Sequence, residues 1–364
     1  MIKPLVALSG GVDSSVAAHI LQSAYGNSIG ATMKLYTNND LDPSYKNKSC
    51  CSLDDVEDAR QVATLLNMPF YVFNFTETFA ETVMERFVEA YQCGQTPNPC
   101  IDCNKYMKFE RFLRRAIELD CTHIATGHYA RITKDANGRY LLKMGMDTAK
   151  DQSYALYTLT QHQLSHLLLP IGELTKDEVR QIAQEQGFVN AKKRDSQDIC
   201  FAPDGDYAAF IERHTSKKIP SGNFINTNGE VIGQHKGIIN YTIGQRKGLG
   251  ISAPHPLFVL SLNAEQNTVT LGENKELFSS SLTAKDVNLI ALDKISGKLH
   301  AQAKIRYSHK AEPATIWQTD ENEVYVEFKN PQRAITPGQA VVLYDGDIVL
   351  GGGRIQGTFS GSSK

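Results

Sequence analysis

The stretch Leu5-Val6-Ala7-Leu8-Ser9-Gly10-Gly11-Val12-Asp13-Ser14-Ser15 decides the fold of this chain. An apolar run, short enough for a buried strand, ends at two glycines, and an apolar helical stripe begins again at Val16. This pattern predicts a strand, a tight loop and the start of a helix. Around Gly10 and Gly11 the backbone N–H groups can approach a ligand closely, and the serine hydroxyls and the helix dipole attract anions. We therefore expect the loop to hold phosphate oxygens.

The loop differs from the common lysine-containing phosphate loop, because no lysine follows its glycines. Residues 9–15, S-G-G-V-D-S-S, instead resemble the PP-loop of ATP pyrophosphatases, which hold pyrophosphate and activate a substrate by transferring AMP to it. The alternative is a glycine-rich turn capped by serines, and we favour nucleotide binding. Asp13 could bind Mg²⁺ or assist proton transfer beside the phosphates, or it could simply cap the helix.

Length and composition limit the classes of protein to consider. The chain has 364 residues, which predicts two or three domains, and its 41% hydrophobic and 21% charged residues are typical of a globular fold. The net charge of -2 argues against a bulk attraction to nucleic acid, so RNA contacts require local patches, and no DNA binding is expected. No apolar run reaches the length of a membrane span, and the first strand leaves no room for a signal peptide. We expect a cytoplasmic protein whose seven cysteines are better suited to reactivity or metal binding than to structural disulfides. Four of them, Cys50, Cys51, Cys93 and Cys121, are interpreted as buried or incidental thiols.

The first half of the chain alternates strand-like and helix-like segments. Beyond the opening unit, we expect strands at 28–35, at 69–75 and ending at Gly127, and helices at 53–66, 79–91 and 104–118. This rhythm predicts an α/β domain built on a parallel sheet with right-handed crossovers. Ligands of such sheets bind at the carboxyl ends of the strands, where the Gly10 loop, Met33 and Gly127 fall.

The second half changes character. Thr175 and Glu178 form a capping box for a helix that ends at Gly187. Asn228-Gly229 signals a hairpin, and period-2 alternation, as in residues 301–307, predicts a small antiparallel β-barrel at the C-terminus. We expect three domains: a catalytic PP-loop domain at 1–205, a small central domain at 206–280 and a β-barrel at 281–364.

Two cysteines lie in settings that favour reactivity. Cys103 closes a C-x-x-C pair with Cys100 and falls at the predicted start of the 104–118 helix, where the dipole, with Lys105 and Lys108, should lower its pKa. Cys200 follows the cations of an extended basic segment, Lys192, Lys193 and Arg194. Two activated thiols suggest sulfur chemistry in which one carries a persulfide and the other receives or resolves it. A zinc half-site is the alternative for the C-x-x-C pair, but no second pair with suitable spacing follows.

Five motifs spread along the chain carry a family resemblance: N-P-C-I-D-C-N at 98–104, T-G-H-Y-A-R at 126–131, K-D-Q-S-Y at 150–154, D-I-C-F at 198–201 and G-Q-R-K-G-L-G at 244–250. With the loop, they closely resemble tRNA-specific 2-thiouridylases over essentially the whole chain. The resemblance implies that ATP adenylates the C2 oxygen of the wobble uridine of tRNA and that sulfur then replaces this oxygen. It also implies a partner that donates persulfide, either a cysteine desulfurase or a sulfur carrier.

The resemblance assigns roles to individual residues. Cys200 matches the persulfide-bearing cysteine and Cys103 its partner nucleophile, and we add Asp13 as a third catalytic candidate. The nucleotide-contacting candidates are Ala7, Leu8, Ser9, Gly10, Gly11, Val12, Asp13, Ser14, Met33 and Gly127. The candidates that face the target base are Asn98, Pro99 and Cys100. The other tRNA-contacting candidates are His128, Lys150, Asp151, Gln152, Arg306, Tyr307 and Gln339.

Some alternatives stay open. Many relatives have an aspartate in place of Cys100, and Cys100, Cys103 and Cys200 could hold a [4Fe–4S] cluster with one open iron site, although we favour a persulfide. Taken by itself, His128 reads as an ordinary hydrogen-bonded histidine. Basic residues around Tyr307 could follow RNA phosphates or form a solvated face. The rival functions are another AMP-forming PP-loop synthetase with a small acceptor and a non-catalytic RNA-binding protein.

Overall fold

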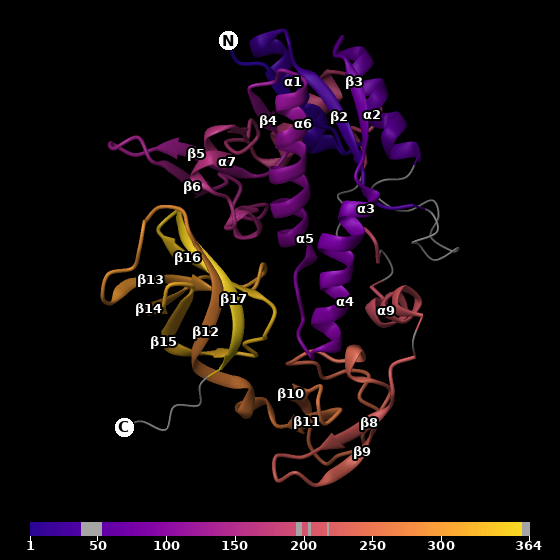
Figure 1. Ribbon diagram of the computed structural model, residues 1–364, viewed down its shortest axis with the longest axis vertical. Helices are drawn as coiled ribbons and strands as arrows, with labels where there is room; N and C mark the ends of the chain where they lie inside the picture. Colours follow the sequence, from indigo (N-terminus) through magenta and orange to yellow (C-terminus); the bar gives the residue numbers. More distant parts are fainter. Residues whose placement is uncertain (38–52, 194–198, 203–204, 217, 359–364) are drawn as a thin grey trace. The chain divides into compact units, whose positions relative to one another are not determined.

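The computed structural model describes all residues except 38–52, 194–198, 203–204, 217 and 359–364 (Figure 1). Cys50, Cys51 and Arg194 lie outside the described residues. The chain divides into two compact units. The first unit consists of Met1–Met84, Pro99–Gly205 and Asp347–Val349, and the second consists of Glu85–Asn98, Asp206–Gly346 and Leu350–Lys364.

A five-stranded parallel sheet forms the centre of the first unit, in the order β3-β2-β1-β4-β7. The strands are β1 (Pro4–Ala7), β2 (Ile29–Lys34), β3 (Phe70–Asn74), β4 (His123–Ala125) and β7 (Leu167–Leu168). The predicted parallel sheet is confirmed, and the short β7 extends it beyond the prediction. The chain runs from β1 to β2 on one side and later to β4 on the other. The carboxyl ends of β1 and β4 therefore form the switch point at which such sheets bind ligands.

Helices cover both faces of this sheet. The helices are α1 (Val12–Tyr25), α2 (Leu53–Leu65), α6 (Phe112–Glu118) and α8 (Lys176–Glu185). On one face α1 and α2 share an apolar cluster with Val6 of β1, and α8 packs on α1 through a second cluster that includes Val179. On the other face Phe112 of α6 contacts Phe73 of β3, with ring centroids 6.1 Å apart. Apolar packing on both faces explains why β1 is buried throughout.

The helix that carries the C-x-x-C pair starts earlier than predicted. It runs without a break through α5 (Pro99–Asp102), η3 (Cys103–Arg111), which is π-helical, and α6. Proline suits the first position of a helix, because it lacks only an N–H that would have no helical partner there. Pro99, rather than Asn104, is therefore the first helical residue, and Cys103 lies one turn inside the helix.

A hairpin that the sequence analysis did not predict completes the first unit. Its strands are β5 (Ala130–Lys134) and β6 (Tyr140–Met144), and η4 (Ser153–Leu156) and α7 (Gln161–Ser165) follow. β6 pairs with Ile348 and Val349, the first residues of β17. Next to them, Asp347 forms ion pairs with Arg131 at 2.8 Å and Lys143 at 2.9 Å. Residues from the far end of the sequence thus belong to this unit.

Further helical segments connect these elements. The helix expected at 79–91 begins earlier, at Thr76, and consists of α3 (Thr76–Phe79), η2 (Ala80–Met84) and α4 (Glu85–Gln92). The segments α3 and η2 belong to the first unit, and α4 belongs to the second. The second unit also contains α9 (Tyr207–Thr215), η5 (Ile238–Asn240) and η6 (Asn274–Leu277). Its smaller sheet has the order β10-β11-β8-β9. These strands are β8 (Gly222–Ile225), β9 (Val231–His235), β10 (Phe258–Asn263) and β11 (Thr268–Gly272).

The predicted C-terminal barrel is present and closed. Its strands are β12 (Phe278–Leu289), β13 (Leu299–Lys304), β14 (Glu312–Asp320), β15 (Glu323–Arg333), β16 (Ala340–Asp345) and β17 (Ile348–Thr358). β12 pairs with both β15 and β17, which closes the antiparallel ring. Val324, Val326 and Phe328 are buried, as the alternation predicts. The alternation expected for 301–307 fails at Tyr307, which is exposed because β13 ends at Lys304.

None of the helices that the structure describes is both long enough and apolar enough to cross a membrane. The capping box at Thr175 is confirmed. The Thr175 hydroxyl accepts from the Glu178 N–H at 3.3 Å, and the Glu178 carboxylate accepts from the Thr175 N–H at 2.7 Å. The Asn228-Gly229 turn joins β8 to β9, as predicted, and Gly229 has a φ of 83°.

Replacing the cap of α8 tests how the start of this helix is held. Thr175→Ala removes the acceptor for the Glu178 N–H and should lower the free energy of unfolding by about 1 kcal/mol. Thr175→Ser keeps the hydroxyl and should stay near the parent. Urea unfolding followed by circular dichroism measures both, and equal losses in the two variants would contradict a role for the cap.

Candidate active site

The loop after β1 depends on a glycine at position 10. Gly10 has a φ of +73°, and a Cβ there would lie 2.4 Å from the carbonyl oxygen of Asp55. Gly11 has a φ of -93° and a ψ of 159°, and a Cβ there would come no closer than 3.4 Å to the Ser9 hydroxyl. Both glycines were expected to permit close backbone approach, but only Gly10 has a conformation and surroundings that exclude a side chain.

The serine hydroxyls of the loop bond mainly to the loop itself. The Ser14 and Ser15 hydroxyls donate to the Gly11 carbonyl at 2.9 and 3.0 Å. The Ser9 N–H donates to the Ser14 hydroxyl at 3.2 Å. The serines therefore shape the loop, and the N–H groups in the first turn of α1, which lack helical partners, are the donors suited to an anion.

Asp13 lies in the first turn of α1 and forms an ion pair instead of capping the helix, whose N-cap is Gly11. Its two carboxylate oxygens accept from the buried Lys176 ammonium at 2.8 and 2.9 Å. The Tyr129 hydroxyl donates to the same carboxylate at 2.8 Å. Lys176 is the first residue of α8, where the helix dipole disfavours a positive charge. Asp13 compensates this charge and links α1 to α8.

Two residues that the sequence analysis did not assign to the loop form hydrogen bonds to it. The buried Asn190 side chain donates to the Gly10 carbonyl and to the Ser15 hydroxyl, both at 2.9 Å. The Lys193 ammonium lies 3.3 Å from the same carbonyl and 2.6 Å from a carboxylate oxygen of Asp55. Lys193 was expected to activate Cys200, but its charge is paired with Asp55 and, also at 2.6 Å, with Asp58. The only feature of the sequence that pointed to a role for this segment was its basic character.

The other nucleotide candidates lie at the same edge of the sheet. Met33 lies near the carboxyl end of β2, and Ala7 and Leu8 are buried at the end of β1. Gly127 follows β4, and a Cβ on it would lie 2.7 Å from the carbonyl carbon of Asp13. The structure thus brings Gly127 into contact with the first turn of α1, as the switch-point argument requires.

The thiol of Cys103 is less acidic than the sequence suggested. Burial raises its pKa to about 11, Lys108 opposes this shift, and Cys100 and Asp102 add to it. The prediction of a lowered pKa was wrong for two physical reasons: Cys103 lies inside a longer helix rather than at its N-terminus, and its surroundings penalise the thiolate. Cys100 is exposed, Cys103 and Cys200 are half-buried, and none of the three forms a disulfide.

The described residues contain no group of three or more His, Cys, Asp or Glu side chains placed to hold a metal ion. Cys100, Cys103 and Cys200 all belong to the described part, so the structure does not present them as a three-thiolate ligand set. For Mg²⁺, the 9–15 loop offers one carboxylate, that of Asp13.

Several tRNA candidates support the structure around β4 and β5. His128 is buried, and burial lowers its pKa well below the usual value, with Lys108 adding to the shift. Its ring bonds to the Thr126 hydroxyl at 2.8 Å and to the Lys108 ammonium at 3.4 Å, so it is a neutral imidazole. Asp151 is buried and accepts from the Ser153 hydroxyl at 2.9 Å. The Gln152 side chain accepts from the Tyr129 N–H at 3.0 Å, and Lys150 is half-buried.

The remaining tRNA candidates belong to the second unit. The Arg306 guanidinium donates to the Ala334 carbonyl and, at 2.8 Å, to the Thr336 hydroxyl. Tyr307 is 45% exposed, and the ammonium of the half-buried Lys304 lies 5.6 Å from its ring centroid. The Gln339 side chain donates to the Thr96 carbonyl at 2.7 Å. Gln339 thus fixes the segment that leads to Asn98, Pro99 and Cys100.

Replacing each glycine of the loop with alanine tests whether the backbone conformation of Gly10 is required for ATP binding. Gly10→Ala forces a side chain against Asp55 and should abolish ATP binding, whereas Gly11→Ala should bind ATP within about threefold of the parent, since its backbone suits any residue. Isothermal titration calorimetry with ATP measures both variants. Equal losses, or normal binding by Gly10→Ala in a folded protein, would show that the strained position does not shape the site.

The raised pKa of Cys103 predicts a steep pH dependence of its reactivity. At pH 8 only about one thiol in a thousand should be thiolate, so the alkylation rate should rise about tenfold per pH unit and show no plateau below about pH 10. Iodoacetamide labelling with peptide fragmentation distinguishes Cys103 from Cys100. A plateau reached by pH 8 would mean that the thiol is activated in the resting protein.

Three family models match the chain. They are described as the tRNA methyl transferase HUP domain at residues 3–204, the tRNA methyl transferase PRC-barrel domain at 208–273 and the aminomethyltransferase beta-barrel domain at 279–355. A tRNA-specific 2-thiouridylase MnmA of Clostridioides difficile is 52% identical over 97% of this chain and 98% of its own length. Proteins of the same name from Lachnoclostridium phytofermentans and Acetivibrio thermocellus are 50% and 51% identical, over 98% and 97% of this chain and 99% of each relative. On this similarity along nearly its whole length, the chain belongs to the tRNA-specific 2-thiouridylase family.

Proposed function

We propose that this protein is an ATP-dependent tRNA-uridine 2-sulfurtransferase. The relatives that match nearly the whole chain carry the name tRNA-specific 2-thiouridylase. The observation that carries the proposal is a phosphate-binding loop at the β1–β4 switch point in the same unit as two unlinked cysteines, Cys103 and Cys200. A small-acceptor synthetase would need the loop but would have no use for both thiols.

In the first step, the uracil C2 oxygen attacks the α-phosphorus of ATP and pyrophosphate leaves. The Gly10 loop and the start of α1 hold the departing phosphates through backbone N–H groups. Mg²⁺, when bound, neutralises phosphate charge, and it prefers one or two carboxylates together with the nucleotide's own oxygens. Asp13 would supply the carboxylate, and it would then share this charge between Mg²⁺ and Lys176. The step turns the C2 oxygen into a good leaving group, because it departs as part of AMP.

In the second step, sulfur replaces this oxygen. A persulfide on Cys200 attacks C2 through its outer sulfur, the C2–O bond breaks, and AMP leaves. The Cys103 thiol then loses its proton and attacks the Cys200 sulfur, which releases 2-thiouridine and forms a Cys103–Cys200 disulfide. A thiol reductant must break this disulfide before a persulfide donor, either a sulfur carrier or a cysteine desulfurase, reloads Cys200. Both thiols keep their roles without a [4Fe–4S] cluster, and the proposal uses none.

The resting state of Cys103 suits this order of events. Because burial keeps its thiol protonated, Cys103 is a poor nucleophile before tRNA and ATP bind. A persulfide on Cys200 is therefore protected from premature attack. Productive deprotonation requires a change around Cys103 that the bound substrates would supply.

The residues proposed to act on tRNA lie in two of the three expected parts, 1–205 and 281–364. Asn98, Pro99 and Cys100 would face the target base beside Cys103. Lys150 is suited to phosphates. Tyr307, which is exposed and lies beside the half-buried Lys304, is suited to a splayed base. His128, Asp151, Gln152, Arg306 and Gln339 would act on tRNA through the segments that they support. We expect the reaction in the cytoplasm, where tRNA and reducing thiols are available.

Replacing Cys200 should separate activation from sulfur transfer. Cys200→Ser should still release pyrophosphate in a tRNA-dependent manner, since the loop is untouched, but it should form no 2-thiouridine from a persulfide donor. Cys93→Ser removes an exposed thiol of the second unit and should behave like the parent. Pyrophosphate release and nucleoside mass spectrometry provide the two readouts. Thiolation by Cys200→Ser would refute the role of Cys200, and failure of the parent protein to thiolate any tRNA would refute the proposed function.

A further inference from the structure

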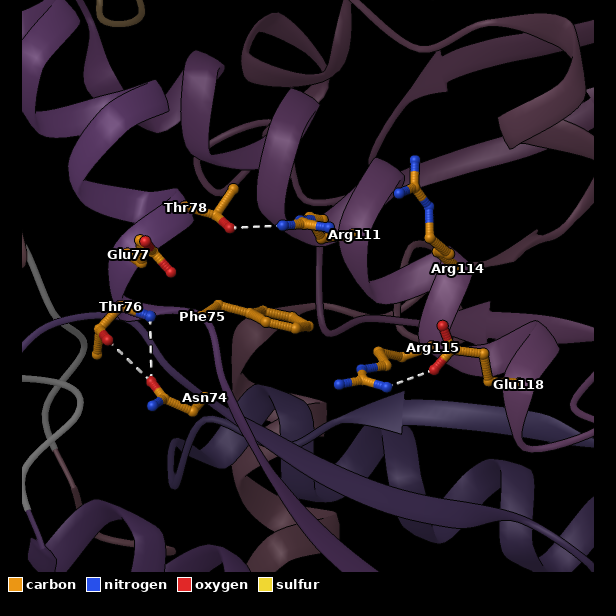
Figure 2. Close-up of a pocket in the computed structure, with 9 residues that line it drawn as sticks. All are labelled: Asn74, Phe75, Thr76, Glu77, Thr78, Arg111, Arg114, Arg115 and Glu118. Carbon is orange, nitrogen blue, oxygen red and sulfur yellow. Dashed lines mark hydrogen bonds and ion pairs between the residues drawn. The ribbon is translucent and has the colours of Figure 1, made fainter.

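A polar cavity in the first unit contains none of the residues assigned so far. It has a volume of about 400 Å³ and is lined by residues 74–78 and by Arg111, Arg114, Arg115 and Glu118 (Figure 2). It lies where β3 ends and α3 begins, opposite the end of the helix that starts at Pro99. The carboxyl end of β3 belongs to the same edge of the sheet as the Gly10 loop. The cavity therefore lies on the side of the unit where the substrates are expected.

Arg111 is the residue that makes this cavity suited to an anion. Its side chain is half-buried, and its guanidinium donates to the Thr78 hydroxyl at 2.8 Å. None of the carboxylates in the described ranges forms an ion pair with it. A single hydroxyl holds the side chain in place and leaves most of its N–H donors for another partner. A fixed guanidinium with spare donors is suited to bidentate binding of a phosphate.

The two neighbouring arginines differ from Arg111 in their partners. Arg115 pairs with Glu118, and its guanidinium carbon lies 5.7 Å from the centroid of the Phe73 ring. Arg114 lies 4.0 Å from Glu110, and both side chains are exposed. Figure 2 shows Arg111 and Arg115 directed toward the space around Phe75, whereas Arg114 points away from it. Arg114 thus has the same charge on the same helix but lies outside the proposed contact.

Other polar groups complete the lining. The Asn74 side-chain oxygen accepts from the N–H and the hydroxyl of Thr76, at 3.2 and 2.9 Å, so its amide N–H groups remain as donors. Of the two carboxylates in the lining, Glu118 is paired with Arg115, which leaves Glu77 and the Arg111 guanidinium as the other charged groups directed to the cavity. Phe75 is buried, with 7% of its surface exposed, and offers no platform on which a base could stack. The cavity is thus equipped for a phosphate rather than for a base.

We propose that this cavity binds a phosphodiester group of the tRNA backbone, with Arg111 as the principal contact. The inference rests on the proposed function. Cys103 and Arg111 are the two ends of η3, so they lie within about 12 Å of each other along the helix axis even at the α-helical rise. An RNA strand that presents its uridine to Cys103 therefore has neighbouring phosphates within reach of Arg111. β3 is separated from β1 by β2, about 10 Å in all, so ATP phosphates held by the Gly10 loop do not fill the cavity.

The test compares two arginines on one helix. Arg111→Ala should weaken tRNA binding roughly tenfold and lower the slope of log affinity against log salt by about 0.7 to 0.9. Arg114→Ala removes the same charge and should change affinity less than twofold. Arg111→Lys, which keeps the charge but loses the planar fork, should fall between them. Filter binding of unmodified tRNA at several salt concentrations measures all three, with thermal unfolding as the control for folding.

Two further measurements distinguish a tRNA phosphate from a nucleotide phosphate as the group bound in the cavity. The KM for ATP and the inhibition by inorganic pyrophosphate should be the same in Arg111→Ala and in the parent. If these values shift while tRNA affinity matches that of Arg114→Ala, the cavity binds nucleotide phosphate and the proposal is wrong. If Arg111→Ala does not fold, Thr78→Val, which frees the guanidinium without removing it, should still weaken tRNA binding, and an unchanged affinity would overturn the proposal. Thiolation by the parent protein is scored separately, so failure of the cavity leaves the proposed function intact.

Discussion

The carbonyl oxygen of Gly10 is the point on which the candidate site depends. It accepts hydrogen bonds from Asn190 and Lys193, residues 180 and 183 positions further along the chain. The positive φ of Gly10 permits this arrangement, and the close approach of Asp55 leaves no room for any other residue. The loop after β1 and residues 190–193 are thus held at one atom. A displacement of the loop therefore changes the hydrogen bonds of Asn190 and Lys193, and a displacement of these two residues changes those of the loop.

The features that local patterns encode could be predicted from the sequence. The strand, loop and helix around Gly10, the parallel sheet, the Asn228-Gly229 turn and the alternation along β15 each follow from residue type and spacing over a few positions. The placement of the Gly10 loop and Gly127 at the carboxyl ends of β1 and β4 followed as well, since both come directly after predicted strands. Short elements with weaker patterns, such as β7 and the β5–β6 hairpin, did not stand out.

The pairing of a charged side chain and the pKa of a thiol depend on residues that are distant in the sequence. For Lys193 and Cys103, the expectations from the sequence were wrong. Lys193 precedes Cys200 and looked like its activator, but Asp55 and Asp58, which come much earlier in the chain, neutralise it. Cys103 looked acidic because its helix was expected to begin beside it, whereas the helix begins at Pro99 and the thiol is desolvated. Neither burial nor pairing can be read from residue spacing, because both are set by tertiary packing.

The ion pairs of Asp347 have a consequence for how the protein is made. Arg131 and Lys143 belong to the first unit, but their carboxylate partner is encoded more than two hundred positions later, beside the two residues that pair with β6. During synthesis on the ribosome, the edge of β6 lacks its β17 partner, and Arg131 and Lys143 lack Asp347, until most of the barrel has been synthesised. The first unit is therefore completed after its own sequence has emerged, and its final stability depends on folding of the last strand. A fragment that contains only the ATP-binding half would retain an open strand edge, which invites aggregation.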